Sequence, residues 1–339
     1  MFYRRSAVRW TLRAAAVALI WLPLAVLTTW AAAALVFDLA FGDANLFLAF
    51  VYIAVVVAIV ALVPGARIKA LACLACFALV LLWWLIVAPS NDRLWQEDVA
   101  NTAWVESDDD DDRVTIHNVR NFDYRSEHDY VPRWETRKYD LGDLRHVDLF
   151  ITYWGSPWIA HPIVSFQFGD KDHLAISVEA RKEVGEEYSA VRGFFRQYEL
   201  IYVVGDERDL VRLRSNFRKG EEVYLYRTRA TPAAAKAIFL DYLRTLNEMR
   251  ERPVFYNALT SNCTTNIRVH VQSGSPLAPW DWRLLLNGKS DEYAYEHSRL
   301  AGDLPFDQLK QRAHINAAAR AAGDAENFSD LIRFDRPGF

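Results

Sequence analysis

The chain has 339 residues, enough for a membrane region and one sizeable domain. A net charge of −4 is too small to indicate nucleic-acid binding, and no basic stripe with interleaved aromatic residues occurs. Three cysteines exclude a disulfide-stapled scaffold. Hydrophobic residues make up 52% of the chain although the mean hydropathy is only −0.05. Because they crowd the first part of the chain, a membrane domain followed by a polar one is expected.

Three long apolar runs follow one another near the N-terminus, at residues 14–37, 46–63 and 70–88. Each approaches or exceeds the roughly 18 residues expected of a membrane-spanning helix. A cleaved signal peptide is the alternative for the first run. That run is too long for a signal core and two more follow it, so we predict a membrane domain over residues 1–89.

Basic residues set the expected orientation of these spans. They precede the first span and occupy the connection between the second and third, as Arg4, Arg5, Arg9, Arg13, Arg67 and Lys69. The connection between the first two spans carries Asp38 and Asp43 and no basic residue. We therefore expect a cytoplasmic N-terminus and an extracytoplasmic domain over residues 90–339.

Two patterns that resemble metal sites have simpler interpretations. Cys73 and Cys76 form a C-x-x-C pattern inside the third span, among Leu, Ala and Phe, so packing is favoured over metal or redox chemistry. Five consecutive aspartates at residues 108–112 lack the spacing, glycine and distal glutamate of a calcium loop, so a solvated loop is favoured. No zinc-protease, phosphate-loop or double Cys/His motif occurs, and no metal, nucleotide or other cofactor is predicted.

Alternating patterns predict a largely antiparallel sheet in the outer region. The expected strands are residues 113–122, 146–154, 158–168, 173–180 and 222–227. Short glycine-containing turns separate the second, third and fourth of these, and such turns imply antiparallel neighbours. Residues 198–204 and 209–214 fit either strands or one broken helix, and the pattern leaves both open.

Helical periodicity follows the strands, which predicts an α+β domain. Thr231 and Pro232 are typical of a helix start, and apolar residues recur on one face up to about Arg250. A shorter helix is expected from Cys263 to about Val271, after the polar turn 260–262. Residues 311–322 are expected to form a surface helix.

Cys263 is the only cysteine outside the hydrophobic N-terminal third, so it has no partner there for an intramolecular disulfide. In the first turn of a helix, unpaired N–H groups and the positive end of the helix dipole favour a thiolate. The same N–H groups suit a developing oxyanion. A buried, inert cysteine is the alternative, and the preceding polar turn favours the reactive one.

A nucleophilic thiol needs a base and a group that orients the base. The outer region offers eight histidines: His117, His128, His146, His161, His173, His270, His297 and His314. His161 stands near the start of an apolar strand, where an imidazole would face a site at a sheet edge. His270 lies two helical turns after Cys263, about 10 Å along the axis, which is too far for a base.

The strand after His161 carries Glu179, which shares one face with Ser177 and Arg181. A carboxylate there is placed to hold the tautomer of His161, as a catalytic triad requires. We therefore predict Cys263 as nucleophile, His161 as base and Glu179 as orienting residue. A structural His161 and an ion-paired Glu179 remain the alternatives.

The outer region resembles the Lnb N-terminal periplasmic domain family over most of residues 112–270. The segments that carry the resemblance are 119–122, 159–161 with 165–166, 177–183, 198–200, 206–209, and 256–257 with 262–265. The resemblance implies a permuted papain-like (NlpC-type) fold, distantly similar to the lecithin:retinol acyltransferase family. In those proteins a His precedes the Cys and an Asn-Cys pair opens a helix, which matches His161, Asn262 and Cys263.

Family members named Lnb are lipoprotein N-acyltransferases. The resemblance implies that Cys263 takes an acyl chain from a membrane lipid as a thioester and passes it to an amine, such as that of a lipoprotein. Oxyanion support is expected from the backbone N–H of Cys263 and from Asn262, Thr264 and Ser165. The expected location is a bacterial inner membrane, with residues 90–339 in the periplasm. Lnb proteins carry the domain before their spans, whereas here it follows three, so the substrate stays open.

Two other functions remain open from the sequence. A cysteine hydrolase would cut peptide or cell-wall amides, and a non-catalytic envelope module would use Cys263 structurally. Arg181, Arg192 and Arg208 are candidates for binding a lipid phosphate, although solvated or ion-paired arginines are commoner. The expected partners are therefore membrane lipid and a lipoprotein acceptor, with no nucleic acid or nucleotide.

Overall fold

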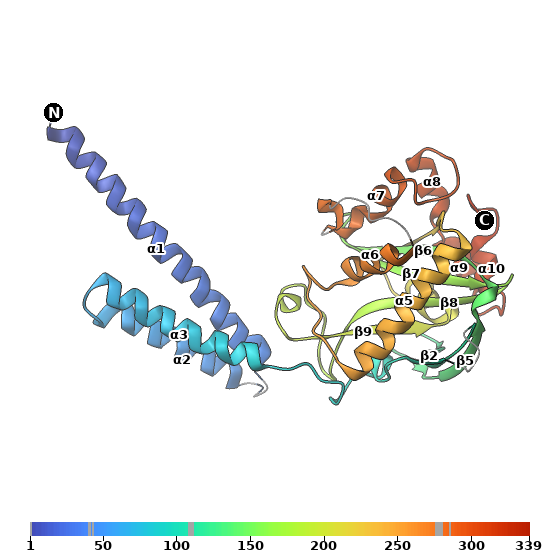
Figure 1. The fold of residues 1–339 in the computed structure, drawn as a ribbon, viewed down its shortest axis with the longest axis horizontal. Helices are drawn as coiled ribbons and strands as arrows, with labels where there is room; N and C mark the ends of the chain where they lie inside the picture. Colours follow the sequence, from blue (N-terminus) through green and yellow to red (C-terminus); the bar gives the residue numbers. More distant parts are fainter. Residues whose placement is uncertain (1, 40–41, 43, 108–111, 275–280, 285) are drawn as a thin grey trace. The chain divides into compact units, whose positions relative to one another are not determined.

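The computed structural model describes residues 2–39, 42, 44–107, 112–274, 281–284 and 286–339 (Figure 1). Two compact units divide the chain. One comprises Met1–Pro89 with Ala190–Gln197, and the other comprises Ser90–Ser189 with Tyr198–Phe339. The first unit is built on long helices, and the second is a mixed α+β domain. Most of the aspartate run, residues 108–111, lies outside the described residues.

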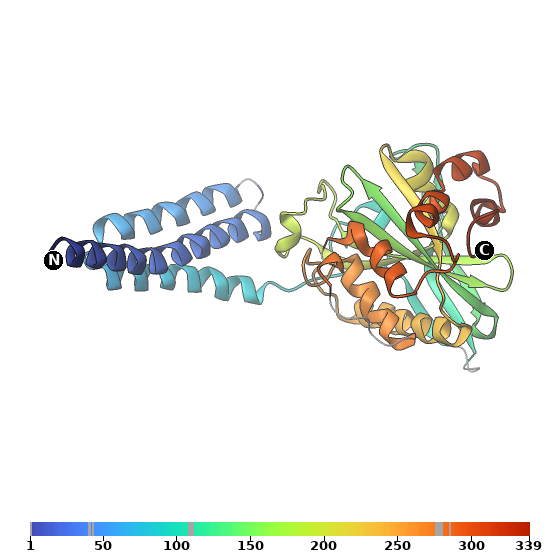
Figure 2. The same cartoon turned by 90° about the horizontal axis from the view of Figure 1, so that it is seen from above.

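The first unit contains the three long apolar helices that the sequence predicts. They are α1 Phe2–Asp38, α2 Ala44–Leu62 and α3 Ala66–Ile86, and each packs against the other two (Figure 2). Residues 19–38 of α1 and the whole of α2 and α3 are long and apolar enough to cross a membrane. Cys73 is buried with Leu24 and Val56 between the helices.

The segment 190–197 packs against the ends of α1 and α3 within this unit. The indole N–H of Trp84 donates to the carboxylate of Asp38 at 2.6 Å. The guanidinium of Arg196 lies over the Trp84 ring and donates to the carbonyl oxygens of Trp84 and Val87, both at 2.6 Å. The carbonyl groups at the end of α3, which lack helical partners, are thereby satisfied.

An eight-stranded sheet is the centre of the second unit. The strands run in the order β1-β2-β9-β8-β7-β6-β10, with β5 paired to β2. Their bounds are β1 Trp104–Ser107, β2 Arg113–Arg120, β5 Trp134–Asp140, β6 Leu144–Trp154, β7 Ala160–Phe168, β8 Asp172–Arg181, β9 Glu199–Gly205 and β10 Glu221–Arg227. All neighbours are antiparallel except β2 and β9, so the mostly antiparallel sheet is confirmed. A separate small ribbon pairs β3 Asp123–Tyr124 with β4 Tyr130–Val131.

Helices cover both faces of the sheet. On one face, α5 (Pro232–Glu251) packs Phe239 and Tyr242 against Phe166 of β7, and α6 (Cys263–Gly274) lies beside α5 (Figure 1). On the other face, α4 (Glu207–Arg212), α9 (Asn316–Ala322) and α10 (Phe328–Arg333) pack against Phe150 and Ile163. The two faces therefore hold two separate apolar cores.

Several expectations about individual elements are corrected. The undecided residues 198–204 form strand β9, whereas residues 209–214 are helical, in α4 and the π-helical turn η4 (Leu213–Phe217). The single helix expected over residues 311–322 is wrong: α8 (Phe306–Ala313) ends before His314, which bridges to Tyr224 of β10, and α9 begins after it. The remaining short helices are η6 (Asn287–Lys289) and α7 (Ser290–Glu296), with single 3-10 turns at η1 (Glu97–Val99), η2 (Leu141–Asp143), η3 (Arg192–Phe194) and η5 (Trp282–Leu284).

Candidate functional site

Cys263 is the first residue of α6, as predicted, and a reciprocal cap holds this helix start. The side-chain oxygen of Asn262 accepts from the backbone N–H of Thr265 at 3.0 Å, and the Thr265 hydroxyl accepts from the backbone N–H of Asn262 at 2.9 Å. This pairing satisfies two N–H groups that a helix start leaves without partners. The Asn262 amide also donates to the carbonyl of Ala258, so its side chain stabilises the turn that leads into α6.

His161 lies where strands β7 and β8 cease to pair. The pairs run from Phe168 with Asp172 to Ile163 with Ser177, and they stop at Pro162, which has no backbone N–H to donate. His161, one residue further along β7, is only 8% exposed. Its Nε2 lies 2.7 Å from the hydroxyl oxygen of Ser177. The end of the ladder thus leaves a place for an imidazole between the two strands.

Glu179 completes a row of contacts on β8. The Ser177 hydroxyl donates to its carboxylate at 2.7 Å, and Nε2 of His161 lies 3.4 Å from the same oxygen. Because the Ser177 hydroxyl donates to Glu179, it accepts the hydrogen on Nε2 of His161. That assignment leaves Nδ1 of His161 as the nitrogen that can accept a proton from a thiol. Glu179 therefore orients the imidazole of His161 both directly and through Ser177.

The Cys263 thiol is a neighbour that raises the pKa of His161, so the predicted nucleophile and base lie close together. Burial and the charge of Arg214 lower the pKa of His161, but the charge of Glu179 and the bonds to Cys263 and Glu179 outweigh them. The net effect raises the pKa of His161 above its ordinary value. The imidazole can therefore hold a proton taken from the thiol.

Arg214 is a site residue that the sequence reasoning missed. It lies on the π-helical turn η4, and its guanidinium donates to the Glu179 carboxylate at 3.0 Å and also pairs with Glu221. Burial raises the pKa of Glu179, but the charges of His161 and Arg214 hold it well below its usual range. Glu179 is therefore ionised at neutral pH. Arg214 lay in a segment whose secondary structure the pattern left undecided, so no signal placed it beside Glu179.

Asn287 is a second residue that the sequence reasoning missed. Its side-chain oxygen accepts from the backbone N–H of Ala160 at 2.9 Å, and its Nδ2 donates to the sulfur of Cys263 at 3.6 Å. The first bond orients the amide, so the N–H donors face the thiol. A Cβ at the neighbouring Gly288 would lie only 2.4 Å from the carbonyl oxygen of Pro157, so glycine allows η6 to approach the start of β7.

The other residues expected to support an oxyanion lie in different surroundings. Thr264 has its hydroxyl 4.0 Å from the Cys263 sulfur, beside the site. Ser165 lies on the same strand as His161, four residues further along the chain. Its hydroxyl donates to the buried carboxylate of Glu207 at 2.5 Å. Among the described residues, the side-chain amide of Asn287 is therefore the N–H donor at the Cys263 sulfur, whereas Asn262 and Ser165 have other partners.

The three arginines proposed for lipid phosphate are not gathered at the thiol. Arg181 is buried and donates to the carbonyls of Val99 and Ala100 and to Asn91. Arg192 belongs to the first unit, where its guanidinium faces the ring of Phe37. Arg208 lies on α4 and donates to the carbonyl of Asp324.

His270 is paired with residues other than Cys263. It bonds Asp241 at 2.8 Å and the Tyr202 hydroxyl at 2.9 Å, and burial lowers its pKa. Within the described part of the chain, no group of three or more His, Cys, Asp or Glu side chains is placed to hold a metal ion. The contacts at the site are those of a thiol with an imidazole, a carboxylate and amide donors.

Comparison with known proteins agrees with the resemblance found in the sequence. Residues 130–288 match the model of the Lnb N-terminal periplasmic domain family, a range that contains Cys263, His161, Glu179 and Asn287. Neither the curated proteins nor the solved structures gave a match. Three helices are long and apolar enough to cross a membrane and residues 130–288 are similar to this periplasmic domain, so the protein is membrane-anchored with a periplasmic domain.

Proposed function

We propose that the protein is a thiol acyltransferase, in which Cys263 accepts an acyl group from a lipid and passes it to an amine. The observation that carries the proposal is the row of contacts from Cys263 through His161 to Ser177 and Glu179. A nucleophile, a base within hydrogen-bond reach and a group that orients the base are the parts that covalent acyl transfer requires. Cys263 lies on helix α6, His161 on strand β7 and Glu179 on strand β8.

In the first step, Nδ1 of His161 takes the proton of the Cys263 thiol. The thiolate attacks the ester carbonyl carbon of the lipid, a C–S bond forms, and the carbonyl electron pair moves onto oxygen. We assign stabilisation of this oxyanion to the backbone N–H of Cys263 and the Nδ2 hydrogens of Asn287. The ester C–O bond then breaks, and the leaving alkoxide takes the proton from the imidazolium. The products are an acyl thioester on Cys263 and a lysolipid.

In the second step, a neutral amine attacks the thioester carbonyl. An N–C bond forms, the C–S bond breaks, and the excess proton of the amine passes to His161 and from there back to the sulfur. Throughout both steps, Glu179 and Ser177 hold the imidazole and balance its positive charge. The acceptor class, a lipoprotein amine, comes from the family resemblance.

Burial of the reacting groups supports transfer over hydrolysis. Cys263 is 6% exposed and His161 is 8% exposed. A thioester formed there is shielded from bulk water, so an amine brought to the site competes better with hydrolysis than it would at an open surface. Three spans also keep the domain at a bilayer, which is the source of acyl chains.

The test uses the full-length protein in detergent with a phospholipid whose acyl chain carries an alkyne tag. We expect one tag on Cys263, released by neutral hydroxylamine because thioesters are labile to it. Cys263→Ala and His161→Ala should both abolish labelling. The matched control is Cys76→Ala, which removes another cysteine, in α3, and should label normally.

Three results would contradict the proposal. Labelling that survives Cys263→Ala would place the chemistry elsewhere. Cleavage of peptides or cell-wall fragments by Cys263 without acyl labelling would identify a hydrolase. No labelling and no cleavage, with Cys263→Ala retaining the cellular phenotype of the wild type, would identify a non-catalytic module.

A further inference from the structure

A group of polar side chains holds the short helix η6, which carries Asn287. This helix begins at Asn287, and helix α7 follows it directly at Ser290. The amide of Asn287 donates to the sulfur of Cys263 at 3.6 Å. The position of that donor therefore depends on what fixes η6 and the start of α7.

Two backbone groups of β7 and the turn before it hold one side of η6. The N–H of Gly288 donates to the carbonyl oxygen of Trp158 at 3.0 Å. The N–H of Ala160 donates to the side-chain oxygen of Asn287 at 2.9 Å. A single hydrogen bond tolerates a range of angles, so the Asn287 amide can still tilt about it. Precise placement of a donor requires further support from neighbouring groups.

Tyr153 supplies such support from β6. Its hydroxyl donates toward the carbonyl oxygen of Gly288, at 3.0 Å, and toward a carboxylate oxygen of Asp291, at 2.8 Å. Tyr153 is also the partner of Ala160 in the β6–β7 ladder. This strand pair therefore holds η6 twice, through the Ala160 backbone and through the Tyr153 side chain.

Asp291 is the residue at which these contacts meet. It is fully buried, and one of its carboxylate oxygens lies within 3.0 Å of the hydroxyl groups of Tyr153 and Tyr226 and the ammonium group of Lys310. Its other oxygen accepts from the backbone N–H of Glu292 at 2.9 Å. A buried carboxylate needs such donors, and each one restricts where it can lie. The start of α7 is therefore tied to β6, β10 and α8.

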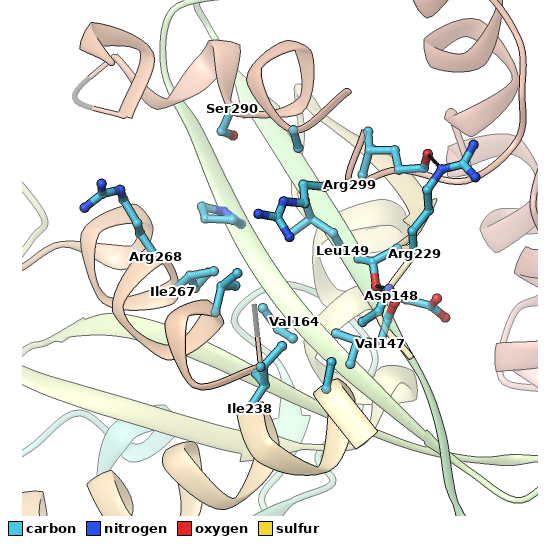
Figure 3. Close-up of a pocket in the computed structure, with 18 of the residues that line it drawn as sticks. Val147, Asp148, Leu149, Val164, Arg229, Ile238, Ile267, Arg268, Ser290 and Arg299 are labelled. Carbon is cyan, nitrogen blue, oxygen red and sulfur yellow. Dashed lines mark hydrogen bonds between the residues drawn. The ribbon is translucent and has the colours of Figure 1, made fainter. Parts of the chain in front are cut away.

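On its other side, α7 borders a pocket rather than closely packed side chains. Ser290, Tyr293 and Ala294 belong to the lining of this pocket, which has a volume of about 350 Å³ and is partly open. Figure 3 shows Ser290 at its edge. Packing restricts an element only where atoms are in contact. The polar contacts of Asp291 therefore fix the placement of α7 more than packing on this side does.

Two of these polar groups lie beyond the part of the chain that matches a known family. The match ends at residue 288, whereas Asp291 and Lys310 follow it. The support for Asn287 therefore comes partly from a segment outside the matched domain.

We propose that Tyr153 and Asp291 are positioning residues for acyl transfer, which hold η6 so that the Asn287 amide points at Cys263. The proposal rests on the proposed function, in which that amide stabilises the oxyanion. A donor that is already in place needs no reorganisation during the reaction, whereas a misplacement of about 1 Å can cost about 10²-fold in rate. Tyr153 and Asp291 act through Asn287 rather than on the reacting atoms.

A double-mutant cycle between Tyr153→Phe and Asn287→Ala tests this coupling. Tyr153→Phe removes one hydroxyl and keeps the ring, so the fold should be retained. In the full-length protein we expect it to slow thioester formation from a palmitoyl phospholipid by about five- to tenfold, the range of one ordinary hydrogen bond. In the Asn287→Ala protein, where the positioned donor is already lost, the same change should have less than about a twofold effect.

Asp291→Asn is the second variant, because it removes the charge with which Lys310 pairs. It should slow thioester formation at least as much as Tyr153→Phe, and again only when Asn287 is present. The matched control is Tyr224→Phe, which removes a hydroxyl from a ring that packs edge-on against Tyr153, with ring centroids 5.4 Å apart. This control should react like the wild type.

The same cycle is also measured on a reaction that needs no acyl donor. Asn287 donates to the sulfur, and such a hydrogen bond stabilises a thiolate over a thiol. Asn287→Ala and Tyr153→Phe should each move the pH profile of Cys263 alkylation by iodoacetamide to higher pH, and the double variant should match Asn287→Ala alone. This pattern in a protein that never forms a thioester would support the positioning role and overturn the proposed function.

Three results would overturn the positioning role and leave the proposed function intact. Rates like those of the wild type in both Tyr153→Phe and Asp291→Asn would show that η6 is held without these groups. An effect of Tyr153→Phe that is equally large in the Asn287→Ala protein would show that it acts independently of the amide. Equal loss of acylation and alkylation, together with a lowered melting temperature, would show general damage to the domain.

Discussion

Two neighbours of opposite charge, Arg214 and Glu179, shift the pKa of His161 in opposite directions. Burial and the guanidinium of Arg214 disfavour a protonated imidazole, whereas Glu179 and the bond to Cys263 favour it, and the pKa is raised on balance. Arg214 also holds Glu179 in its ionised form. The carboxylate is thus a group that favours a proton on His161.

Replacing Glu179 by Gln should move the reactivity of Cys263 to higher pH. Without the carboxylate, the imidazolium that forms when His161 takes the thiol proton is less stable, so less thiolate exists at neutral pH. A nearby opposite charge shifts a pKa by about one to three units, so we expect the alkylation profile to rise by roughly one pH unit or more. Iodoacetamide labelling of Cys263 from pH 5 to 10 measures it.

Glu222→Gln is the matched control, since Glu222 is a more exposed carboxylate on β10 that pairs with His314. Its profile should coincide with that of the wild type. An unchanged profile for Glu179→Gln would show that the carboxylate does not support the imidazolium.

Replacing Asn287 by Ala should slow acylation more than alkylation. The lost amide removes one donor to the oxyanion, and single donors of this kind contribute about 10²–10³ in kcat. Alkylation of Cys263 by iodoacetamide forms no oxyanion and loses only the bond from Asn287 to the sulfur, so its rate should fall less than the acylation rate. Parallel loss of both rates would instead show that Asn287 only maintains the structure, through its bond to Ala160.

At the scale of elements, the start of α6 and the position of η6 were not equally predictable. The Asn262-Cys263 start could be predicted because capping involves residues within four positions of each other. Asn287 reaches the sulfur because η6 docks against the start of β7. The bond between Asn287 and Ala160 joins residues that lie 127 positions apart in the chain. No local pattern encodes such a contact.

Helix α10 is held to the sheet by a buried ion cluster. Arg333 contacts both oxygens of Glu207 at 2.6 and 2.7 Å and also donates to Asp148 at 3.0 Å. Burial raises the pKa of Glu207, but the charge of Arg333 outweighs it and lowers the pKa to about 2. Glu207 is therefore a buried anion, and its charged and hydrogen-bonding neighbours offset the cost of burying its charge.

Arg333→Met should destabilise the second unit by about 3–5 kcal/mol, because it leaves Glu207 charged and buried. At roughly 2–4 °C per kcal/mol for this size, the melting temperature should fall by about 10 °C at pH 7. Near-ultraviolet circular dichroism of the full-length protein in detergent measures it. Arg320→Met, on the exposed face of α9, is the control and should change stability by less than about 0.5 kcal/mol.

The pH dependence has a definite sign. A carboxylate whose folded pKa lies below its unfolded value contributes stability above the unfolded pKa and loses it as the pH falls through the folded pKa. For Glu207 this window runs from about 4.3 down to about 2. The difference between the wild type and Arg333→Met should shrink across that window. A difference that stays constant would show that lost packing, and not the charge of Glu207, causes the effect.

At the scale of the whole molecule, the chain joins a membrane anchor to a periplasmic domain that is similar to the Lnb N-terminal domain family. The proposed chemistry needs both, since an acyl donor is a component of the membrane and the thiol lies in the domain. A membrane-bound domain can take an acyl chain without carrying a whole lipid through water, which would expose its apolar surface.

The amino-acid sequence by itself determined the three apolar helices, the main strands, the helix that begins at Cys263 and the similarity of the domain to a known family. These features depend on residues that are close in the chain: apolar length, alternation, turns and caps. It also indicated His161 and Glu179, because their strands are adjacent and their side chains share one face.

Only the tertiary structure decided the rest. The contacts of Arg214 with Glu179 and of Asn287 with Cys263 join elements that are distant in the chain. Their positions depend on how helices pack on the sheet, where many side chains together set each distance. The physical reason is that close packing is a collective property of the fold, whereas periodicity and capping are local.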